Sequence, residues 1–379
     1  MTRVAVIGGG IAGTAAALAL HKAGCAVAVH EAHPDAAEDI GAFLTLASNG
    51  MRALAELDAS SAVTAIGFPL TSLRLLDHTG AEVAHNPMGE AADPLLRYRC
   101  LRRGDLNTAL QKEAVRRGIT VRHGARLVTV EEGSAGVTAH FADGSTATAD
   151  LLIGADGLNS AVRRGISPDT RPVYAGQRVF YGYTHAAAPP SEDACITMIR
   201  GSGAAFGYAV SPEGETYWFA RVSADAPLSA EELAEGTPAG WRDLLVSSLR
   251  ADATPAAGIV AATTDDLLVT NATEIPTGTP WRSGRILLIG DAAHAASPAT
   301  GQGASMALED AVVLAKSLRD APGLDAGLDL YETLRRPRVE HNITVSGGIS
   351  RGTRTPSTAA RPSEEELARL LAWERLLGQ

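Results

Sequence analysis

Short apolar runs separated by glycines mark the first elements of the chain. Residues 4–7 form an apolar run that ends at a glycine, which is typical of a buried parallel strand. Residues 12–23 are rich in alanine and leucine and precede Gly24, so they predict a helix that ends there. Residues 27–31 predict a second strand. Together these segments predict a strand–helix–strand unit with parallel strands.

Two kinds of pattern alternate along the rest of the chain. Residues 70–84 and 121–149 predict strands joined by short turns, with no helix between them. Residues 285–290 return to the buried-strand pattern. Residues 352–362, rich in Arg, Thr, Ser and Pro, predict a loosely packed crossing. Further helices are predicted over residues 51–57, 105–117, 304–319 and 363–376.

Aromatic residues gather in one part of the chain. Of 17 aromatics, eight fall within 40 positions: Phe180, Tyr181, Tyr183, Phe206, Tyr208, Tyr217, Trp218 and Phe219. They fit the core of a sheet, because aromatic residues favour strands. They also fit the wall of an apolar ligand pocket. We expect both, with most of the eight in the core. Phe180, Tyr208 and Arg221 are the candidates to face a substrate.

Composition excludes several classes of protein. With 45% hydrophobic and 20% charged residues, the 379-residue chain is typical of a globular enzyme. A net charge of −10 argues against nucleic acid or an anionic membrane as partner. Residues 4–20 are apolar, but their glycines and short length argue against a signal peptide or a membrane span. Monomer and homodimer both stay open.

The three cysteines bear on metal binding and location. Cys25, Cys100 and Cys195 are far apart, so they show neither metal-ligand spacing nor a disulfide framework. We therefore predict no metal and a cytoplasmic protein.

The first glycine cluster has the spacing of a dinucleotide-binding turn. Gly8, Gly10 and Gly13 follow a predicted strand and open a helix, with Ile11 and Ala12 between the last two. Such glycines allow a tight turn, close approach of a pyrophosphate and close strand–helix packing, while the helix N-terminus offers free N–H groups. Glu31, which ends the second strand, is placed to accept hydrogen bonds from ribose hydroxyls and would repel a 2′-phosphate. The motif does not decide between NAD and FAD.

Two later segments favour FAD. Residues 151–157 predict a buried strand that ends in Asp156-Gly157, followed by Ser160 and Arg163. The strand over residues 285–290 ends at Asp291, whose carboxylate would reach the ribityl hydroxyls of a flavin. Residues 301–304, including Gly303 and Ala304, begin a helix whose positive end would face the flavin O2 region and stabilise negative charge there.

With these motifs the chain resembles the class A FAD-dependent monooxygenases, the p-hydroxybenzoate hydroxylase-like family. The resemblance implies that Arg103 reaches the ribityl–pyrophosphate region and that Asp156 contacts both FAD and the nicotinamide cofactor. It also implies that Asp291 binds ribitol, while Pro298 and Gly301 belong to a loop beside the isoalloxazine ring. In relatives the segment at Gly41-Ala42 passes near that ring. Ala32 departs from the pattern, since many relatives carry arginine there.

The expected fold is α/β, a three-layer Rossmann-like FAD-binding domain with an inserted antiparallel β-sheet substrate domain. The FAD-binding domain is expected from residues 1–69, 98–172 and 276–350, and the substrate domain from 70–97 and 173–275. Residues 351–379 are expected to form a C-terminal helical tail.

The expected activity is that of an FAD-dependent monooxygenase. The resemblance implies that NADPH or NADH, bound transiently, reduces the flavin, and that O2 forms a flavin C4a-(hydro)peroxide. This species would insert one oxygen atom, most simply by hydroxylation, into an apolar aromatic or polycyclic molecule. Because the cofactor carries the chemistry, no catalytic side chain is assigned. Epoxidation, Baeyer–Villiger oxidation, a flavin oxidase or reductase, and a non-catalytic flavin-binding protein are the alternatives. His294 is expected to order its loop through hydrogen bonds.

Overall fold

A computed structural model describes residues 1–36, 41–90, 92–134, 136–264, 267–353 and 363–378. Most of the predicted crossing at 352–362 lies outside the described residues. In the described part of the chain, no helix combines the length and apolarity needed to cross a membrane.

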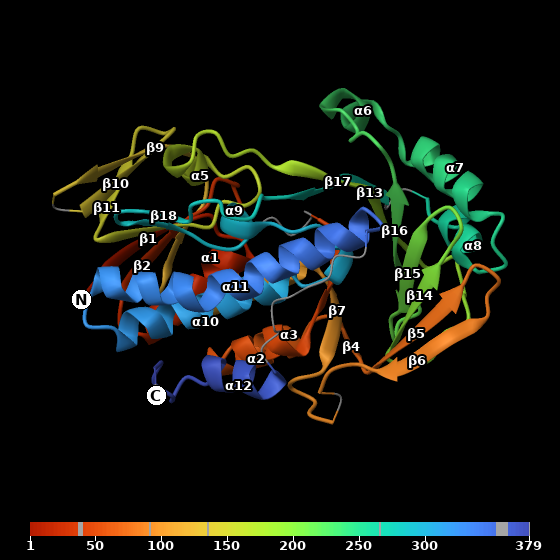
Figure 1. The fold of residues 1–379 in the computed structure, drawn as a ribbon, viewed down its shortest axis with the longest axis horizontal. Helices are drawn as coiled ribbons and strands as arrows, with labels where there is room; N and C mark the ends of the chain where they lie inside the picture. The colour runs from red at the N-terminus through yellow and green to blue at the C-terminus, as the bar shows by residue number, and fades with distance from the viewer. Residues whose placement is uncertain (37–40, 91, 135, 265–266, 354–362, 379) are drawn as a thin grey trace.

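A parallel sheet built around the N-terminal strand organises one half of the molecule (Figure 1). Neighbouring strands of this sheet are parallel, except that β18 and β19 at one edge are antiparallel. The predicted strand–helix–strand unit is its centre. In spatial order its strands are β18 (Arg282–Ser283), β19 (Ile286–Leu288), β12 (Leu151–Gly154), β1 (Arg3–Ile7), β2 (Ala26–His30) and β8 (Thr120–Arg122).

Two further layers cover this parallel sheet. One is a back sheet of β9 (Leu127–Gly133), β10 (Gly136–Phe141) and β11 (Thr146–Ala149), with α5 (Ala161–Ile166) beside it. The other is helical, because the apolar stripes of its helices pack on the sheet and on each other. Its members are α1 (Ile11–Lys22), α2 (Ser48–Glu56), α3 (Ser60–Thr64), α4 (Arg103–Arg116), α10 (Gly303–Asp320), α11 (Leu324–Ser350) and α12 (Glu364–Leu371).

The second half of the molecule is built on a largely antiparallel sheet, with a parallel pair only between β5 and β14. A small sheet of β3 (Phe43–Leu46), β7 (Tyr98–Arg102) and β4 (Phe68–Leu70) joins the two halves. In spatial order the strands of the antiparallel sheet are β17 (Leu267–Glu274), β13 (Val173–Thr184), β16 (Thr216–Ser223), β15 (Ala205–Val210), β14 (Cys195–Arg200), β5 (Ser72–Asp77) and β6 (Glu82–Pro87).

The predicted fold class is confirmed, and three details of the sequence interpretation are corrected. α11 was not predicted, because Pro337 and Gly347-Gly348 interrupt its pattern. The aromatic-rich region also holds helices that were not predicted: α6 (Ala230–Glu235), α7 (Pro238–Leu249) and α8 (Ala256–Ala261). The last predicted helix, over 363–376, is shorter, since α12 ends at Leu371 and the carbonyls of Leu370 and Ala372 accept hydrogen bonds from Lys316.

Two adjacent acidic residues of α10 anchor a buried network of charges. Glu309 and Asp310 are fully buried, and so is Arg335 of α11, whose guanidinium donates to both carboxylates. Asp310 also accepts from the backbone N–H of Gly290 (3.1 Å) and from His294 Nε2 (2.6 Å). Burial alone would raise the pKa of Asp310, but His294 and Arg335 outweigh it and hold that pKa below its usual range. The predicted ordering role of His294 is confirmed.

Arg335→Met will lower the free energy of unfolding by about 3–5 kcal/mol, because it removes the fully buried counter-charge that Glu309 and Asp310 share. Chemical denaturation measures the change. Arg369→Met is the matched control, since it removes only an exposed ion pair with Glu365 and will leave the denaturation midpoint unchanged. Equal effects of the two substitutions would show that the buried network does not hold the helices together.

Candidate active site

The predicted motifs meet at the carboxyl ends of four neighbouring parallel strands. Glu31 follows β2, Gly8 follows β1, Asp156 follows β12 and Gly290 follows β19 by two residues. A Cβ on Gly8 would lie 2.4 Å from the carbonyl oxygen of Ala155. A Cβ on Gly290 would lie 2.6 Å from the Ala12 Cβ. Segments about 280 residues apart therefore touch at one edge of the sheet, where open α/β sheets bind ligands.

The glycine turn leaves space at the start of α1. A Cβ on Gly13 would lie 1.9 Å from the carbonyl oxygen of Gly8, so strand and helix are in direct backbone contact there. A Cβ on Gly10 would meet nothing within 4 Å. The helix start carries no side-chain cap and no acidic residue in its first turn, so the N–H groups of Ile11 and Ala12 remain available. This open, electropositive helix end fits a pyrophosphate.

Two carboxylates near the turn have different surroundings. Glu31 accepts hydrogen bonds from the backbone N–H groups of Gly9 (2.6 Å) and His33 (2.7 Å), which aim it at the glycine turn. Asp156 accepts from Ala161 N (2.7 Å) and from the Ser160 hydroxyl, and so caps α5. The structure therefore gives Asp156 a local structural role that the sequence interpretation did not foresee.

The second half of the candidate site is open to solvent. Asp291 begins α9 (Asp291–His294), is exposed, and has no hydrogen-bond partner among the described residues. Pro298 opens the short 3₁₀ helix η1 (Pro298–Thr300), and Gly301 follows it in the left-handed conformation (φ 63°). Gly303 then starts α10, with Ala304 after it, again without a side-chain cap. A Cβ on Gly303 would meet nothing within 4 Å.

Arg103 lies beside the Gly41-Ala42 turn. It begins α4, its side chain is exposed, and its Cδ would lie 3.1 Å from a Cβ on Gly41. Its backbone N–H donates to the carbonyl of Ala42 (3.1 Å). The Arg103 side chain and the Gly41-Ala42 turn therefore pack closely against each other.

The eight clustered aromatics divide evenly between the two faces of the antiparallel sheet, because side chains alternate along a strand. One face lies under α7 and α8 and holds Phe180, Phe206, Tyr208 and Trp218. Phe180 is fully buried beside Trp241, and the Tyr208 hydroxyl donates to the carbonyl of Pro190. Phe180 and Tyr208 therefore lie in the closed core under α7 and α8, and the expected contact of these two side chains with a substrate stays a prediction. Arg221, in contrast, lies on the other face.

That other face packs against the small sheet. The sequence alone did not show which of the two faces packs there. Phe43, just after the Gly41-Ala42 turn, inserts among the aromatics there, with ring centroids 5.6 Å from Tyr217 and 6.1 Å from Tyr181. Tyr181 and Phe219 remain partly exposed although their strands are central in the sheet. The alternation of side chains along residues 179–183 and 217–221 predicts two faces of the sheet, but it does not show which of the two faces the candidate site.

A cavity of about 390 Å³ lies beyond the loop at Thr300 and Gln302. Arg52 lines this cavity and pairs with Glu90. Arg338, also in its wall, pairs with Glu309. Because these charges are already paired, we assign no ligand to this cavity.

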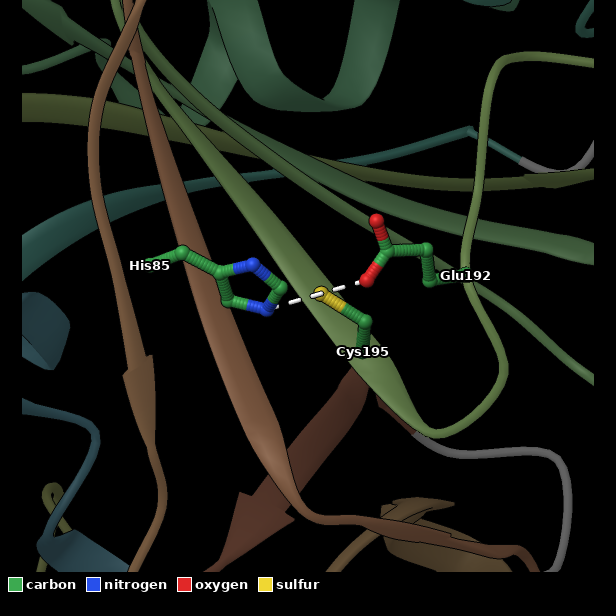
Figure 2. A group of neighbouring side chains, drawn as sticks. All are labelled: His85, Glu192 and Cys195. Carbon is green, nitrogen blue, oxygen red and sulfur yellow. Dashed lines mark ion pairs between the residues drawn. The ribbon is translucent and has the colours of Figure 1, made fainter.

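One group of described side chains has the spacing of metal ligands. Ligand atoms of His85, Glu192 and Cys195 lie within 4.8 Å of one another (Figure 2). The two carboxylate oxygens of Glu192 already face Arg74 and His85 Nε2, the latter at 3.7 Å. A cation there would stand beside the Arg74 guanidinium, so we assign this group to an ion-pair cluster that ties the loop before β14 to the sheet edge.

Comparison with known proteins is consistent with this geometry. A family model described as an FAD binding domain matches residues 1–346. Aurachin C monooxygenase/isomerase of Stigmatella aurantiaca is 31% identical over 382 residues, covering 98% of this chain and 95% of the relative. 3-Amino-4-hydroxybenzoate 2-monooxygenase of Streptomyces cremeus is 32% identical over 350 residues, covering 89% and 84%. The crystal structure of Klebsiella pneumoniae HpxO complexed with FAD and uric acid superposes with a TM-score of 0.82 at 27% identity, covering 97% and 90%.

Gly13→Ala will destabilise the fold by about 3 kcal/mol, because the new methyl group collides with the Gly8 carbonyl and neither backbone can retreat. Gly10→Ala is the matched control: it lies three residues away in open space and will stay within about 1 kcal/mol of the parent protein. Thermal and chemical denaturation of the ligand-free forms of both variants and of the parent protein give the comparison. Wild-type stability of Gly13→Ala would contradict the contact between β1 and α1.

Proposed function

The chain belongs to the FAD-binding domain family, that of the class A FAD-dependent monooxygenases, and from this premise we propose that it hydroxylates an aromatic small molecule with O2 and NADPH or NADH. One observation carries the proposal. Three separated segments supply an open helix N-terminus, an unpartnered carboxylate and an exposed glycine loop along one edge of the parallel sheet.

We assign the parts of FAD to these residues in order. Glu31 accepts hydrogen bonds from the adenosine ribose, and the pyrophosphate lies at Gly10, Ile11 and Ala12. Asp291 accepts hydrogen bonds from the ribityl hydroxyls, with Arg103 assigned to the ribityl–pyrophosphate region. The support is the packing of the turn glycines, since a Cβ on Gly10 would meet nothing within 4 Å, whereas one on Gly8 or Gly13 would collide with a backbone carbonyl. Asp156 holds the turn after β12 in place by capping α5.

The isoalloxazine ring is assigned to the loop formed by Pro298, Gly301, Gly303 and Ala304. The bound flavin supplies the redox chemistry and the activation of O2. The protein contributes the uncapped start of α10, whose N–H groups stabilise negative charge on the reduced ring. The reductant would bind only transiently, since the one glycine fingerprint in the sequence is assigned to FAD.

The substrate is assigned to the partly exposed aromatic face of the antiparallel sheet. Phe43 packs against the rings of Tyr181, Tyr217 and Phe219 on this face, and such an aromatic surface would keep water away from a bound substrate. The names of the relatives point to aromatic and heteroaromatic molecules, among them 3-amino-4-hydroxybenzoate and uric acid. An oxidase or reductase remains the alternative activity, and the oxygen-labelling experiment below separates it.

Asp291→Ala will lower FAD retention at least tenfold, because the ribityl hydroxyls lose their acceptor while the fold is untouched at this exposed position. Retention is measured as flavin absorbance relative to protein after dialysis. Asp169→Ala removes another exposed carboxylate away from the motifs and will retain FAD fully. Gly10→Ala provides a second check, since its methyl group fills the proposed pyrophosphate space and will also release FAD. Full occupancy in Asp291→Ala would rule out the assigned contact.

Turnover under ¹⁸O2 will place one labelled oxygen atom in the product, with the other leaving as water. The measurement uses NADPH or NADH, a panel of aromatic substrates that stimulate its oxidation, and mass analysis of the products. An unlabelled product, or one labelled only from H₂¹⁸O, would replace the monooxygenase assignment with the oxidase or reductase activity.

A further inference from the structure

A buried guanidinium without a partner lies on the aromatic face of the antiparallel sheet. Arg221 belongs to β16, where it alternates with Tyr217 and Phe219 and pairs across to Val179. Only 9% of the residue is exposed. Its Nε and Nη1 atoms are fully buried and have no hydrogen-bond partner in the described part of the chain.

The guanidinium lies on the sheet face that also carries Tyr217 and Phe219. Its central carbon lies 5.7 Å from the ring centroid of Phe219, so the side chain folds along the aromatic face toward the partly exposed rings. Tyr181 lies near both Arg221 and Arg103. Burial raises the pKa of Tyr181 to about 12 although both cations act to lower it, so the phenol stays neutral at physiological pH and does not neutralise them.

The guanidinium groups of the other buried arginines in the described part of the chain, Arg99, Arg163 and Arg335, each donate at least two hydrogen bonds, which makes Arg221 an exception. Arg99 is 7% exposed, and its guanidinium donates to the carbonyls of Thr64, Ile66 and Gly67. Arg335 contacts two carboxylates. Burying an unpaired charge is costly, so an arginine kept in this state points to a partner that the described residues do not supply.

We propose that Arg221 is the counter-charge for an ionised group of the substrate, so that the aromatic substrate binds as an organic anion. The inference rests on the proposed function and specifies its substrate class. A guanidinium donates two parallel hydrogen bonds to a carboxylate, and it can also donate to the oxygen of a phenolate or an enolate. Phe219 and Tyr181 flank it with rings that hold the aromatic part of the same molecule.

The first experiment measures binding to the FAD-loaded protein through changes in the flavin absorption spectrum. The probes are 3-amino-4-hydroxybenzoate and 6-hydroxy-2-naphthoate, the methyl ester of each, and 2-aminophenol and 2-naphthol, which lack the carboxylate. The wild-type protein will bind at least one acid tenfold or more tightly than its ester. Arg221→Met will abolish that preference, and Arg221→Lys will retain part of it.

The series distinguishes the two sources of negative charge. Tight binding of a phenol that strengthens as the pH rises through its pKa would identify the ionised phenol as the group bound, and this also supports the proposal. Equal binding of acids and esters with no such pH dependence, or no binding of any probe to the wild-type protein, overturns it.

The second experiment compares stability, which a structural arginine and a ligand-binding arginine affect in opposite ways. Arg221→Met will keep or raise the denaturation midpoint of the FAD-loaded protein, because it removes an unpaired buried charge. Arg99→Met, the matched control, will lower the midpoint, because it leaves three carbonyls without their donor. A midpoint of Arg221→Met that falls as far as that of Arg99→Met would show that Arg221 has a structural partner.

Two outcomes separate this inference from the proposed function. Loss of FAD from Arg221→Met would assign the guanidinium to the cofactor and overturn the substrate assignment. A wild-type protein without FAD, or without labelled product, would instead remove the proposed function. Retained FAD and labelled product without any acid preference would remove only the inference about Arg221.

Discussion

The buried carboxylate of Asp310 is the interaction on which the candidate site depends. This carboxylate accepts hydrogen bonds from Arg335 of α11, His294 of α9 and the backbone N–H of Gly290. It therefore fixes the turn that presents Asp291 relative to the helix that begins at the exposed glycine loop. Its neighbour Glu309 receives Arg335, Arg338 and Asn49, and Asn49 also donates to Gln302, so α2 and that loop are held by the same pair of acids.

Close backbone approach is the second constraint. Gly290 packs on Ala12, Gly8 packs on Ala155, and Gly13 packs on Gly8. Each contact admits no Cβ, which brings the ends of four strands and the start of α1 within reach of a single extended ligand. The same crowding makes Gly10 distinctive, because it alone among these turn glycines faces open space. We therefore assign the proposed pyrophosphate binding to Gly10, where close packing is absent.

The antiparallel sheet separates stability from recognition by using its two faces differently. The face under α7 and α8 is closed: Trp218 stacks on Phe206 and donates to Thr263, and Phe180 is fully buried. The face toward Phe43 is less complete, with Tyr181 and Phe219 partly exposed and Arg221 unpaired. A well-packed core on one side allows the other side to keep groups that lower stability but can bind a ligand.

The sequence by itself determined the strand–helix–strand unit, the glycine turn, the acid after β2 and the α/β class, because these follow from local periodicity and from the backbone freedom of glycine. It did not determine which alternate set of aromatics faces the site, since a period of two defines two faces and only the docking of α7 and α8 decides which one is covered. It also could not show that Asp156 caps a helix, that Asp310 holds three elements, or that Arg221 lacks a partner. Most of those facts depend on contacts between residues far apart in the chain. Whether a buried charge stabilises the fold or is left to bind a ligand depends on the neighbours that tertiary packing places around it.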